Sequence, residues 1–198
     1  MKPFSEACER NQDPILDVLR QWFASPGTVL EIGSGTGQHA VHFARHLPHL
    51  HWVCTDREEN HSGIRAWLDE AQLPNLSGPL ELDVTQASWP VDAADYVFSA
   101  NTAHIMGWPE VEALFAGAGK VLSAGGVLCL YGPFNSSGKF TSDSNRAFDA
   151  MLRRRNPVMG IRDDRALVAL GQVNELTLQA DHAMPANNRI LVWKKAPL

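Results

Sequence analysis

Hydrophobic residues along the chain fall into two kinds of pattern, short continuous runs and longer stretches with helical spacing. In the stretch 109–122, apolar residues recur in i, i+3, i+4, i+7 order, which places them on one face of an α-helix. Runs of about five apolar residues are too short for such a face and are typical of buried strands. The two patterns predict helices at 14–25, 38–47, 62–71, 109–122, 144–155 and 163–170, and strands at 28–32, 51–55, 80–84, 96–100, 127–131, 173–178 and 189–193.

The order of these elements indicates the fold class. Strands that alternate with helices at this spacing form βαβ units, so the first five strands are expected in a parallel sheet. The last two strands are separated by only ten residues, too few for a helical crossover, and are therefore expected to be antiparallel. No repeat, linker or low-complexity tract interrupts the pattern, so residues 1–198 are interpreted as a single α/β domain.

The first helix is predicted to begin at Pro14. Asp13 belongs to the residue types favoured at helix N-caps, and proline is favoured at the first helical position. Pro26 and Gly27 end this helix. Residues 1–26 are therefore expected to form an N-terminal lid and helix.

Residues 29–37, V-L-E-I-G-S-G-T-G, carry the most informative motif. A predicted strand ends in three glycines at alternate positions, Gly33, Gly35 and Gly37, and a predicted helix follows at once. Such a turn brings a nucleotide-like ligand close to backbone amides. The alternative is a tight turn that binds nothing, although one glycine would suffice for it. Gln38 stands where a dinucleotide fingerprint has its third glycine, which argues against a dinucleotide.

This motif resembles the first motif of the class I S-adenosylmethionine-dependent methyltransferases, in which the glycine turn passes under the methionine part of the cofactor. The resemblance implies a Rossmann-like seven-stranded sheet of strand order 3-2-1-4-5-7-6, with strand 7 antiparallel. It also implies S-adenosyl-L-methionine as the cofactor.

Ligands of open parallel sheets bind beyond the carboxyl ends of the strands. The end of the first strand supplies five candidate cofactor-binding residues: Glu31, Gly33, Ser34, Gly35 and Gly37. Asp56 ends the second strand, nineteen residues after Gly37, where an acid accepts hydrogen bonds from both ribose hydroxyls. Asp83 and Val84 end the third strand, where a carboxylate and an amide are able to contact adenine. For both acids, a role in a helix cap or turn is the alternative.

The fourth and fifth strands end in the candidate catalytic residues Asn101, His104 and Tyr131, because in the superfamily these two edges face the transferable methyl group. Asn101 is also a candidate cofactor contact. Asn101 is able to orient a nucleophile, His104 to take a proton if the nucleophile carries one, and Tyr131 to hydrogen-bond the substrate or close the pocket. A hydrogen-bonded structural histidine is the alternative for His104.

Composition and charge narrow the choice of partners. The net charge of −5 argues against a broad nucleic-acid surface, which is normally basic. No stretch approaches an apolar membrane span, and the N-terminus lacks the features of a signal peptide. Neither the three cysteines nor the eight histidines have a convincing metal-ligand spacing, so no metal is expected, and a reducing cytoplasm is the expected location. The basic run 153–155 is interpreted as a helix end.

Several further segments resemble one uncharacterised family of methyltransferase-like proteins, known as a domain of unknown function, over nearly the whole chain. These segments are Glu9-Arg10-Asn11 with Pro14-Ile15, S-G-T-G-Q-H at 34–39, Asn101 with His104-Ile105, Y-G-P-F at 131–134, Thr141-Ser142 with Ser144-Asn145, Phe148-Asp149, G-I-R-D at 160–163 and M-P-A-N-N at 184–188. The family implies the fold and a cofactor but no substrate. Gly33 stands where alanine is frequent, and Cys54-Thr55-Asp56 replaces the usual Pro-Ser-Asp with the acid kept.

Two segments outside the sheet are expected to reach the same edge. Arg10 and Asn11 precede the predicted first helix and are expected to fold over the cofactor as a lid, with Arg10 paired to the methionine carboxylate. The loop 181–188 between the last two strands is expected to bring Asn187 and Asn188 to the site, either as substrate contacts or as turn residues. Ser142 is a candidate cap of the helix that follows it.

Together, these features predict an S-adenosylmethionine-dependent methyltransferase (EC 2.1.1.-) that acts on an unidentified small molecule. The acidic surface and the lack of an appended recognition domain favour a small substrate. Two alternatives are an S-adenosylmethionine-binding regulator without transferase activity and a nicotinamide-dependent oxidoreductase. Gln38 and the absence of a Tyr-x-x-x-Lys dyad count against the oxidoreductase. The sequence leaves the oligomeric state open.

Overall fold

The fold is built on one seven-stranded sheet, seen in a computed structural model that describes residues 2–197. The strand order is β3-β2-β1-β4-β5-β9-β8. The parallel strands are β1 (Gly27–Ile32), β2 (Leu50–Asp56), β3 (Leu76–Glu81), β4 (Ala94–Ala100) and β5 (Leu122–Gly132). β9 (Asn188–Lys195) runs antiparallel to both of its neighbours, β5 and β8 (Leu176–Met184). The predicted fold class, strand order and antiparallel last strand are confirmed.

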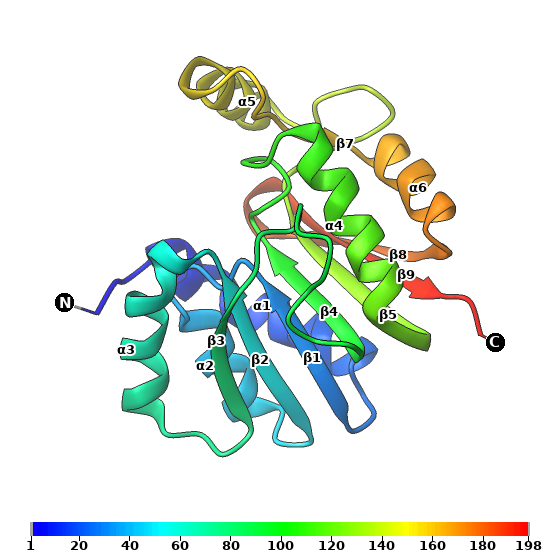
Figure 1. Ribbon diagram of the computed structural model, residues 1–198. Helices are drawn as coiled ribbons and strands as arrows, with labels where there is room; N and C mark the ends of the chain where they lie inside the picture. The colour runs from blue at the N-terminus through cyan, green and yellow to red at the C-terminus, as the bar shows by residue number, and fades with distance from the viewer. Residues whose placement is uncertain (1, 198) are drawn as a thin grey trace.

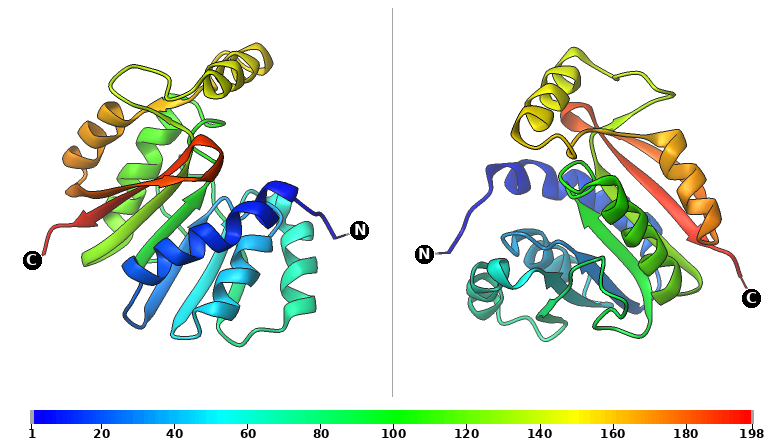
Figure 2. Two further views of the ribbon diagram at one scale, coloured as in Figure 1. Left: turned by 180° about the vertical axis from the view of Figure 1, so that it is seen from behind. Right: turned by 45° about the horizontal axis from the view of Figure 1, so that its top comes forward.

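Helices cover both faces of the sheet (Figure 1). One face carries α1 (Glu6–Trp22), α2 (Gln38–His46) and α3 (His61–Ala71), and the other carries α4 (Trp108–Val121) and α6 (Asp164–Val173). Each face therefore buries its own apolar cluster, with Phe43, Trp52 and Phe98 in contact in the first and Phe115 against Trp193 in the second. α5 (Asp143–Arg155) stands beyond the carboxyl ends of the strands, as all three views show (Figures 1 and 2).

The first helix begins earlier than predicted. Ser5 is its N-cap, with a side-chain oxygen that accepts the Cys8 N–H at 3.3 Å, and Pro14 lies inside the helix. The prediction of a start at Asp13 and Pro14 is therefore wrong. The serine cap and two acids in the first turn, Glu6 and Glu9, favour helix formation from that end. Burial of the apolar face then offsets the backbone hydrogen bond that proline removes.

The edge strands differ most from the prediction. β3 ends at Glu81, so Asp83 and Val84 follow the strand, whereas the prediction placed the strand at 80–84. Leu82 and Val84 lie in the loop and pack against the α4 face of the sheet. Their apolar side chains therefore resembled the end of a strand, which explains why the strand was predicted too far along the chain. β8 continues to Met184, and only η2 (Pro185–Asn187) separates it from β9. The loop predicted at 181–188 is thus a short hairpin tip.

Two short strands that periodicity did not predict lie beside the site. β6 (Phe134–Asn135) and β7 (Arg162–Asp163) form a two-stranded parallel sheet. Two residues are too few to produce an alternating pattern in a sequence. This pair joins the two ends of the segment that carries α5.

Several properties of the described chain bear on its chemistry. Within residues 2–197, none of the helices combines the length and the apolar character needed to cross a membrane. In the same residues, no group of three or more His, Cys, Asp and Glu side chains is arranged to hold a metal ion. Cys8, Cys54 and Cys129 are free thiols.

Gly117 in α4 seats the loop that carries Asp83 and Val84. A Cβ at position 117 would lie 1.9 Å from Cζ2 of Trp89, and the Trp89 indole donates a hydrogen bond to the Val84 carbonyl at 3.3 Å. We expect Gly117→Ala to lower the free energy of unfolding by about 1–3 kcal/mol, because the indole must leave its position. Urea denaturation followed by circular dichroism measures this loss.

The control for this prediction is the same substitution in a Trp89→Leu background. There, Gly117→Ala is expected to be neutral or stabilising, because alanine has the higher helix propensity and the obstructing ring is gone. Equal losses in both backgrounds would contradict the packing explanation.

Candidate functional site

The glycine turn after β1 has a backbone conformation that favours glycine. Gly33, Gly35 and Gly37 have φ angles of 71°, 59° and 89°. A Cβ on Gly33 would lie 2.7 Å from Cγ2 of Thr102, whereas a Cβ on Gly35 would meet no atom within 4 Å. The predicted strand–turn–helix arrangement is present, and at Gly35 the turn faces open space at the carboxyl edge of the sheet.

Asp56, at the end of β2, braces this turn. One carboxylate oxygen accepts the Gly35 N–H at 2.7 Å. The other accepts the N–H of Arg57 at 2.7 Å and the Nδ2–H of Asn60 at 2.8 Å. A carboxylate has about four lone-pair positions, so one position remains for a ligand. Asn60, in η1 (Glu58–Asn60), is a site residue that the motifs did not reveal, although its spacing of four residues from the acid permits the contact.

Glu31 lies beneath the turn and is only 2% exposed. Its Oε2 accepts the Ser34 hydroxyl at 2.9 Å and the Trp52 indole N–H at 3.0 Å. Burial raises the pKa of Glu31 to about 7, and the hydrogen bonds from Trp52 and Ser34 oppose this shift. Because the carboxylate faces protein groups, any effect of Glu31 on a ligand is transmitted through Ser34.

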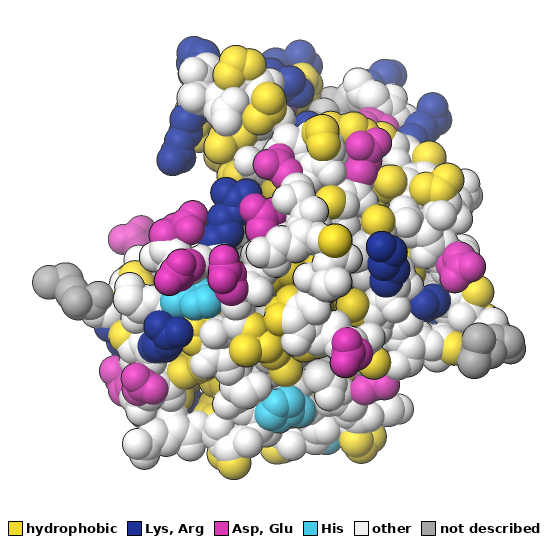
Figure 3. Space-filling view, in the orientation of Figure 1, with side chains coloured by type: hydrophobic (Ala, Val, Ile, Leu, Met, Phe, Trp, Pro, Cys, Tyr) yellow, Lys and Arg dark blue, Asp and Glu magenta, His cyan; other side chains and the backbone are white. Residues whose placement is uncertain are grey.

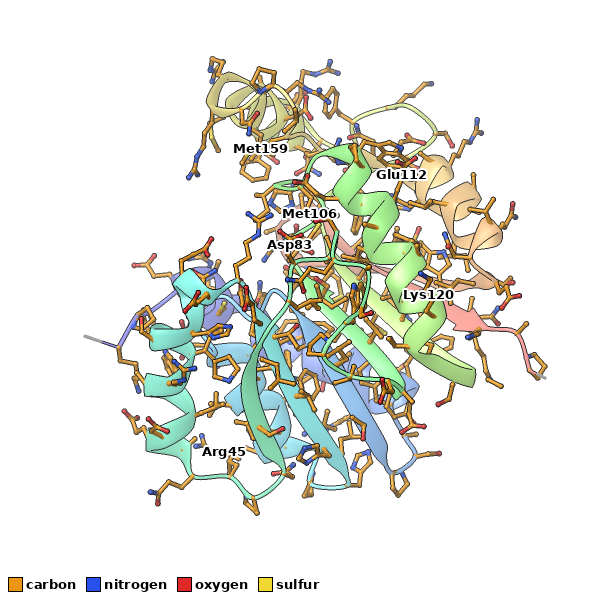
Figure 4. All side chains as sticks on the ribbon, viewed as in Figure 1. Arg45, Asp83, Met106, Glu112, Lys120 and Met159 are labelled. Carbon is orange, nitrogen blue, oxygen red and sulfur yellow. The ribbon has the colours of Figure 1, made fainter. Side chains whose placement is uncertain are left out.

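Asp83 and Val84 lie at the same edge, just after β3. Asp83 accepts the N–H and hydroxyl of Thr85 at 3.0 and 2.7 Å and lies 3.5 Å from the Arg57 guanidinium. The Thr85 backbone, the Thr85 hydroxyl and Arg57 together hold the pKa of Asp83 below its usual value. Val84 has a buried side chain, which leaves its backbone as the part able to contact a ligand. In Figure 4, Asp83 lies below Met106 and Met159 at the top of the sheet.

The ends of β4 and β5 converge on Gly132. A Cβ on Gly132 would lie 3.8 Å from Nδ1 of His104 and 4.0 Å from Oδ1 of Asn101. Asn101 has a left-handed φ of 59° and donates its N–H to the Tyr131 carbonyl at 2.9 Å. The structure therefore brings the side chains of Asn101 and His104 close to one point, where Tyr131 contributes its backbone carbonyl.

His104 is a neutral group at this position. It is 7% exposed, and its ring packs edge-on against Phe148 of α5 at a centroid distance of 5.3 Å. Burial, and to a lesser extent the charge of Arg162, lower the pKa of His104 to about 4. A base is most effective when its pKa lies near the working pH, so His104 is a weak base at neutral pH. Its role as a proton acceptor stays a prediction.

Tyr131 belongs to a group of four residues from distant segments, which we call the polar cluster: Asn11, His39, Tyr131 and Asn188. Burial raises the pKa of Tyr131, against the effect of hydrogen bonding by the Asn11 and Asn188 side chains. Asn11 Oδ1 lies 2.7 Å from His39 Nε2. Burial lowers the pKa of His39 to about 4, so the cluster is uncharged at neutral pH. Sequence motifs contained all four residues but did not indicate that they meet.

The N-terminal segment packs across the glycine turn. The Ser5 N–H donates to Gln38 Oε1, and Gln38 Nε2 donates to the Ser5 carbonyl at 3.4 Å. Arg10 and Asn11 lie within α1 and not ahead of it, which corrects their predicted place in an extended lid. The Arg10 side chain is 72% exposed and lies 3.6 Å from Glu6, so its pairing with a cofactor carboxylate stays a prediction.

The hairpin tip between β8 and β9 lies at the same edge, because Arg189 pairs with Gly132. Asn145 in α5 donates to the Asn187 carbonyl at 3.1 Å, and Asn187 Nδ2 donates to the Ser144 hydroxyl at 3.1 Å. Asn187 thus serves the turn and fastens α5, whereas Asn188 adjoins Tyr131. Ser142 caps α5 as predicted, since its hydroxyl accepts the Asn145 N–H at 3.0 Å.

Arg162 is a further residue that sequence reasoning did not assign. Its Nε donates to the Ala103 carbonyl at 2.9 Å, and its terminal nitrogen donates to the carbonyls of Met106 and Val158. These bonds hold the loop that carries His104. The G-I-R-D motif at 160–163 contains Arg162 and was the feature of the sequence that pointed to this residue.

The surface around the site is hollowed. Figure 3 shows a notch between α5 and the side of the molecule that carries α3, with basic side chains gathered on α5. A hollow of about 300 Å³ lies at the hairpin tip, lined by Asn187, Asn188 and Arg189 among others. A larger one of about 430 Å³ lies between the end of α3 and the start of β3. This larger hollow is at the amino end of the strands, the wrong end for a ligand of a parallel sheet.

Several solved structures with a similar fold are methyltransferases. An O-methyltransferase family protein from Burkholderia thailandensis aligns with a TM-score of 0.84 and 17% identity over 97% of this chain and 58% of its own. An O-methyltransferase family 2 protein from Planctomyces limnophilus, in complex with apigenin, aligns with a TM-score of 0.83 and 16% identity over 94% and 57%. CalO1, a methyltransferase in calicheamicin biosynthesis with SAH bound, aligns with a TM-score of 0.75 and 20% identity over 94% of this chain and 54% of its own.

These likenesses establish the class I methyltransferase fold. The chain spans a little over half the length of each of these proteins. A sequence model of one family, described as protein of unknown function (DUF938), matches residues 2–195, almost the whole chain. The protein therefore belongs to the DUF938 family, an uncharacterised family with a methyltransferase-like fold.

Proposed function

We propose that this protein is an S-adenosylmethionine-dependent methyltransferase that acts on a small molecule. The observation that carries the proposal is the turn at Gly35, which is open to a ligand on one side and held by the Asp56 carboxylate on the other. This arrangement fits a ligand with a ribose and a polar tail. Backbone amides are available to the tail, and an acid lies beside them for the ribose.

The predicted residues fit the parts of this cofactor as follows. The amides of the turn and the Ser34 hydroxyl would hold the methionine part, with Glu31 fixing Ser34 from below. Asp56 would accept one ribose hydroxyl at its remaining lone pair, and Asp83 with the Val84 amide would contact adenine. Arg10, on the same helix as Asn11, would pair with the methionine carboxylate.

When bound, the cofactor would supply a methyl group on a positively charged sulfur. The residues at the ends of β4 and β5 would then orient the acceptor: Asn101 and His104 as hydrogen-bonding partners, and Tyr131 through its hydroxyl. Holding the acceptor in line and excluding water are the main contributions that a protein makes to such a transfer. α5, which lies over His104 through Phe148, would keep water out.

Two features support a small acceptor. The net charge of −5 opposes a nucleic acid, and related folds include one crystallised with apigenin and one from calicheamicin biosynthesis. A cytoplasmic location is part of the proposal, because the three free thiols suit a reducing compartment. A binding protein without transferase activity remains the second candidate.

We expect calorimetric titration of the full chain with S-adenosylhomocysteine to give one site per chain and titration with NADH to give none. The turn has no third dinucleotide glycine, so it cannot receive a pyrophosphate in the usual way. Tritium transfer from methyl-labelled S-adenosylmethionine to small compounds of a cell extract then separates an enzyme from a binding protein. Binding of NADH in place of S-adenosylhomocysteine would contradict the proposal, and binding without any transfer would favour the second candidate.

A further inference from the structure

The groups that line the acceptor side of the site are uncharged. Asn101 Oδ1 and His104 Nδ1 lie around the same point near Gly132, and the Tyr131 hydroxyl, from the residue before Gly132, belongs to the polar cluster. His104 has Phe148 of α5 against its ring, and the cation near it, Arg162, is bound to backbone carbonyls. A buried imidazole beside a cation resists a proton, and the pKa of about 4 agrees with this environment.

The Tyr131 hydroxyl is already oriented by its neighbours. The His39 Nε2 donates to Asn11 Oδ1, which leaves the Asn11 amide hydrogens for Tyr131. Hydrogen bonding by the Asn188 side chain also lowers the pKa of Tyr131, as expected of an amide that donates to the phenol oxygen. Cys8 and Arg10 of α1 are the titratable groups that face the hydroxyl, and both are weaker influences than burial, which raises its pKa. Tyr131 is therefore a held hydrogen-bonding group and not a base.

The carboxylates around this point are each engaged elsewhere. Asp149 on α5 accepts from the Ile161 N–H and from Arg153, both at 2.8 Å, and Glu110 on α4 accepts from the Gly107 N–H. Asp56 holds the glycine turn, and Glu31 is sealed beneath it. These four carboxylates are thus each bound by donors of the protein itself.

From this arrangement we infer that the acceptor brings a nucleophilic atom that is unprotonated in neutral solution, such as a thiolate, the oxygen of an acidic phenol or an aromatic ring nitrogen. The inference rests on the proposed methyltransferase function. The acceptor lone pair forms the new bond to the methyl carbon while the carbon–sulfur bond breaks and its electron pair stays on sulfur. The positive charge of the sulfonium is cancelled by an anionic acceptor or passes to the ring nitrogen. No proton is transferred to the protein in this step.

The test uses acceptors of similar size and different ionisation. Tritium transfer from labelled S-adenosylmethionine is measured with 4-nitrothiophenol, 4-nitrophenol and isoquinoline, and with phenol and 2-phenylethanol, which stay protonated at neutral pH. We expect transfer to at least one of the first three that exceeds transfer to the last two by at least about a hundredfold, the usual contribution of a general base that is absent here. Comparing transfer to the nitrothiophenol and the nitrophenol with transfer to isoquinoline shows whether the site prefers an anionic nucleophile or a neutral ring nitrogen.

The pH dependence identifies which group titrates. With 4-nitrophenol, kcat/KM is expected to rise with the ionisation of the phenol, in wild type and in His104→Gln alike, although the variant is slower because the acceptor is less well oriented. His51→Gln, at the far end of β2 and exposed, is the matched control and should match wild type. A profile that loses its titration in His104→Gln would overturn the inference and make His104 the base.

A second measurement does not depend on turnover. With S-adenosylhomocysteine bound, His104 is expected to stay neutral by ¹⁵N NMR down to pH about 5, with or without 4-nitrophenol, consistent with its low pKa. A His104 that titrates near neutrality would contradict the inference. Labelled products from a cell extract with no transfer to any of the first three acceptors would overturn it too and leave the proposed function standing. Failure to bind S-adenosylhomocysteine would instead remove the proposed function itself.

Discussion

Gly35→Val is expected to weaken binding of S-adenosylhomocysteine by at least about 100-fold, or about 2.7 kcal/mol, while the protein stays folded. Gly35 has a φ of 59°, which a β-branched residue rarely adopts, and its Cβ would project into the open space that the ligand needs. No protein atom within 4 Å would clash with that Cβ, so the loss falls on binding more than on stability. Calorimetry of binding and thermal unfolding, measured on the same samples, separate the two effects.

Asp56→Asn is expected to give a loss of the same kind. The amide replaces one acceptor oxygen by a donor, which then faces the N–H groups of Gly35 or of Arg57 and Asn60. The turn loses its brace and the ribose loses its acceptor. The control for the glycine variant is Gly138→Val, because Gly138 also has a positive φ of 76° and open surroundings but lies in another loop. Unchanged affinity for S-adenosylhomocysteine in both Gly35→Val and Asp56→Asn would show that the ligand does not bind at the glycine turn.

Arg189→Leu is expected to lower the free energy of unfolding by about 1–3 kcal/mol, between the effects of breaking an exposed and a fully buried ion pair, because these pairs are partly buried. The Arg189 side chain is 13% exposed. Its Nε donates to Oδ1 of Asp181 at 2.9 Å, and its Nη2 donates to Oδ2 of Asp164 at 2.9 Å. It also donates to the carbonyl of Asn135 at 3.2 Å. Its removal leaves two carboxylates without their cation at the junction of β9, β8 and α6. Urea unfolding at pH 7 measures the loss.

The matched control is Arg20→Leu, which removes an exposed ion pair with Asp17 in α1 and is expected to cost less than about 1 kcal/mol. The pH dependence provides a second check. Burial would raise the pKa of Asp164, but the Ser137 N–H and Arg189 outweigh it and hold the pKa below its usual value. The stabilisation is therefore present above the unfolded pKa and is lost as the pH falls through the folded pKa, in the acid range below about pH 4. This acid-dependent loss should shrink in Arg189→Leu, and an unchanged profile would contradict the role given to the pair.

Local signals in the sequence were sufficient for the glycine turn and the acid that faces it. A turn of three alternate glycines needs φ angles that only glycine adopts readily, and an acid at the end of the second strand follows at a fixed spacing. The closing hairpin was predictable for the same kind of reason, because ten residues cannot form a helical crossover. The start of α1 was missed, since Asp13-Pro14 resembles a helix start while Ser5 caps the real one.

The position of β3 shows how tertiary packing overrides a local pattern. Leu82 and Val84 alternate with polar residues like a strand, yet they pack in a loop on the α4 face because Trp89 and Gly117 provide a seat there. As an edge strand, β3 buries little of its own surface, so its pattern is weak. No count of residues along the chain distinguishes the two cases.

The sequence by itself determined the glycine turn and the acid of the proposed cofactor site at β1 and β2, because those residues are close together along the chain. Only the tertiary structure decided that Asn11, His39, Tyr131 and Asn188 form one uncharged cluster, and that His104 is buried beside Arg162. Hydrogen bonding and desolvation depend on the distance between groups and on what surrounds them, and for residues separated by tens of positions these are properties of the folded chain. The unprotonated acceptor that we infer follows from the uncharged cluster and from the burial of His104.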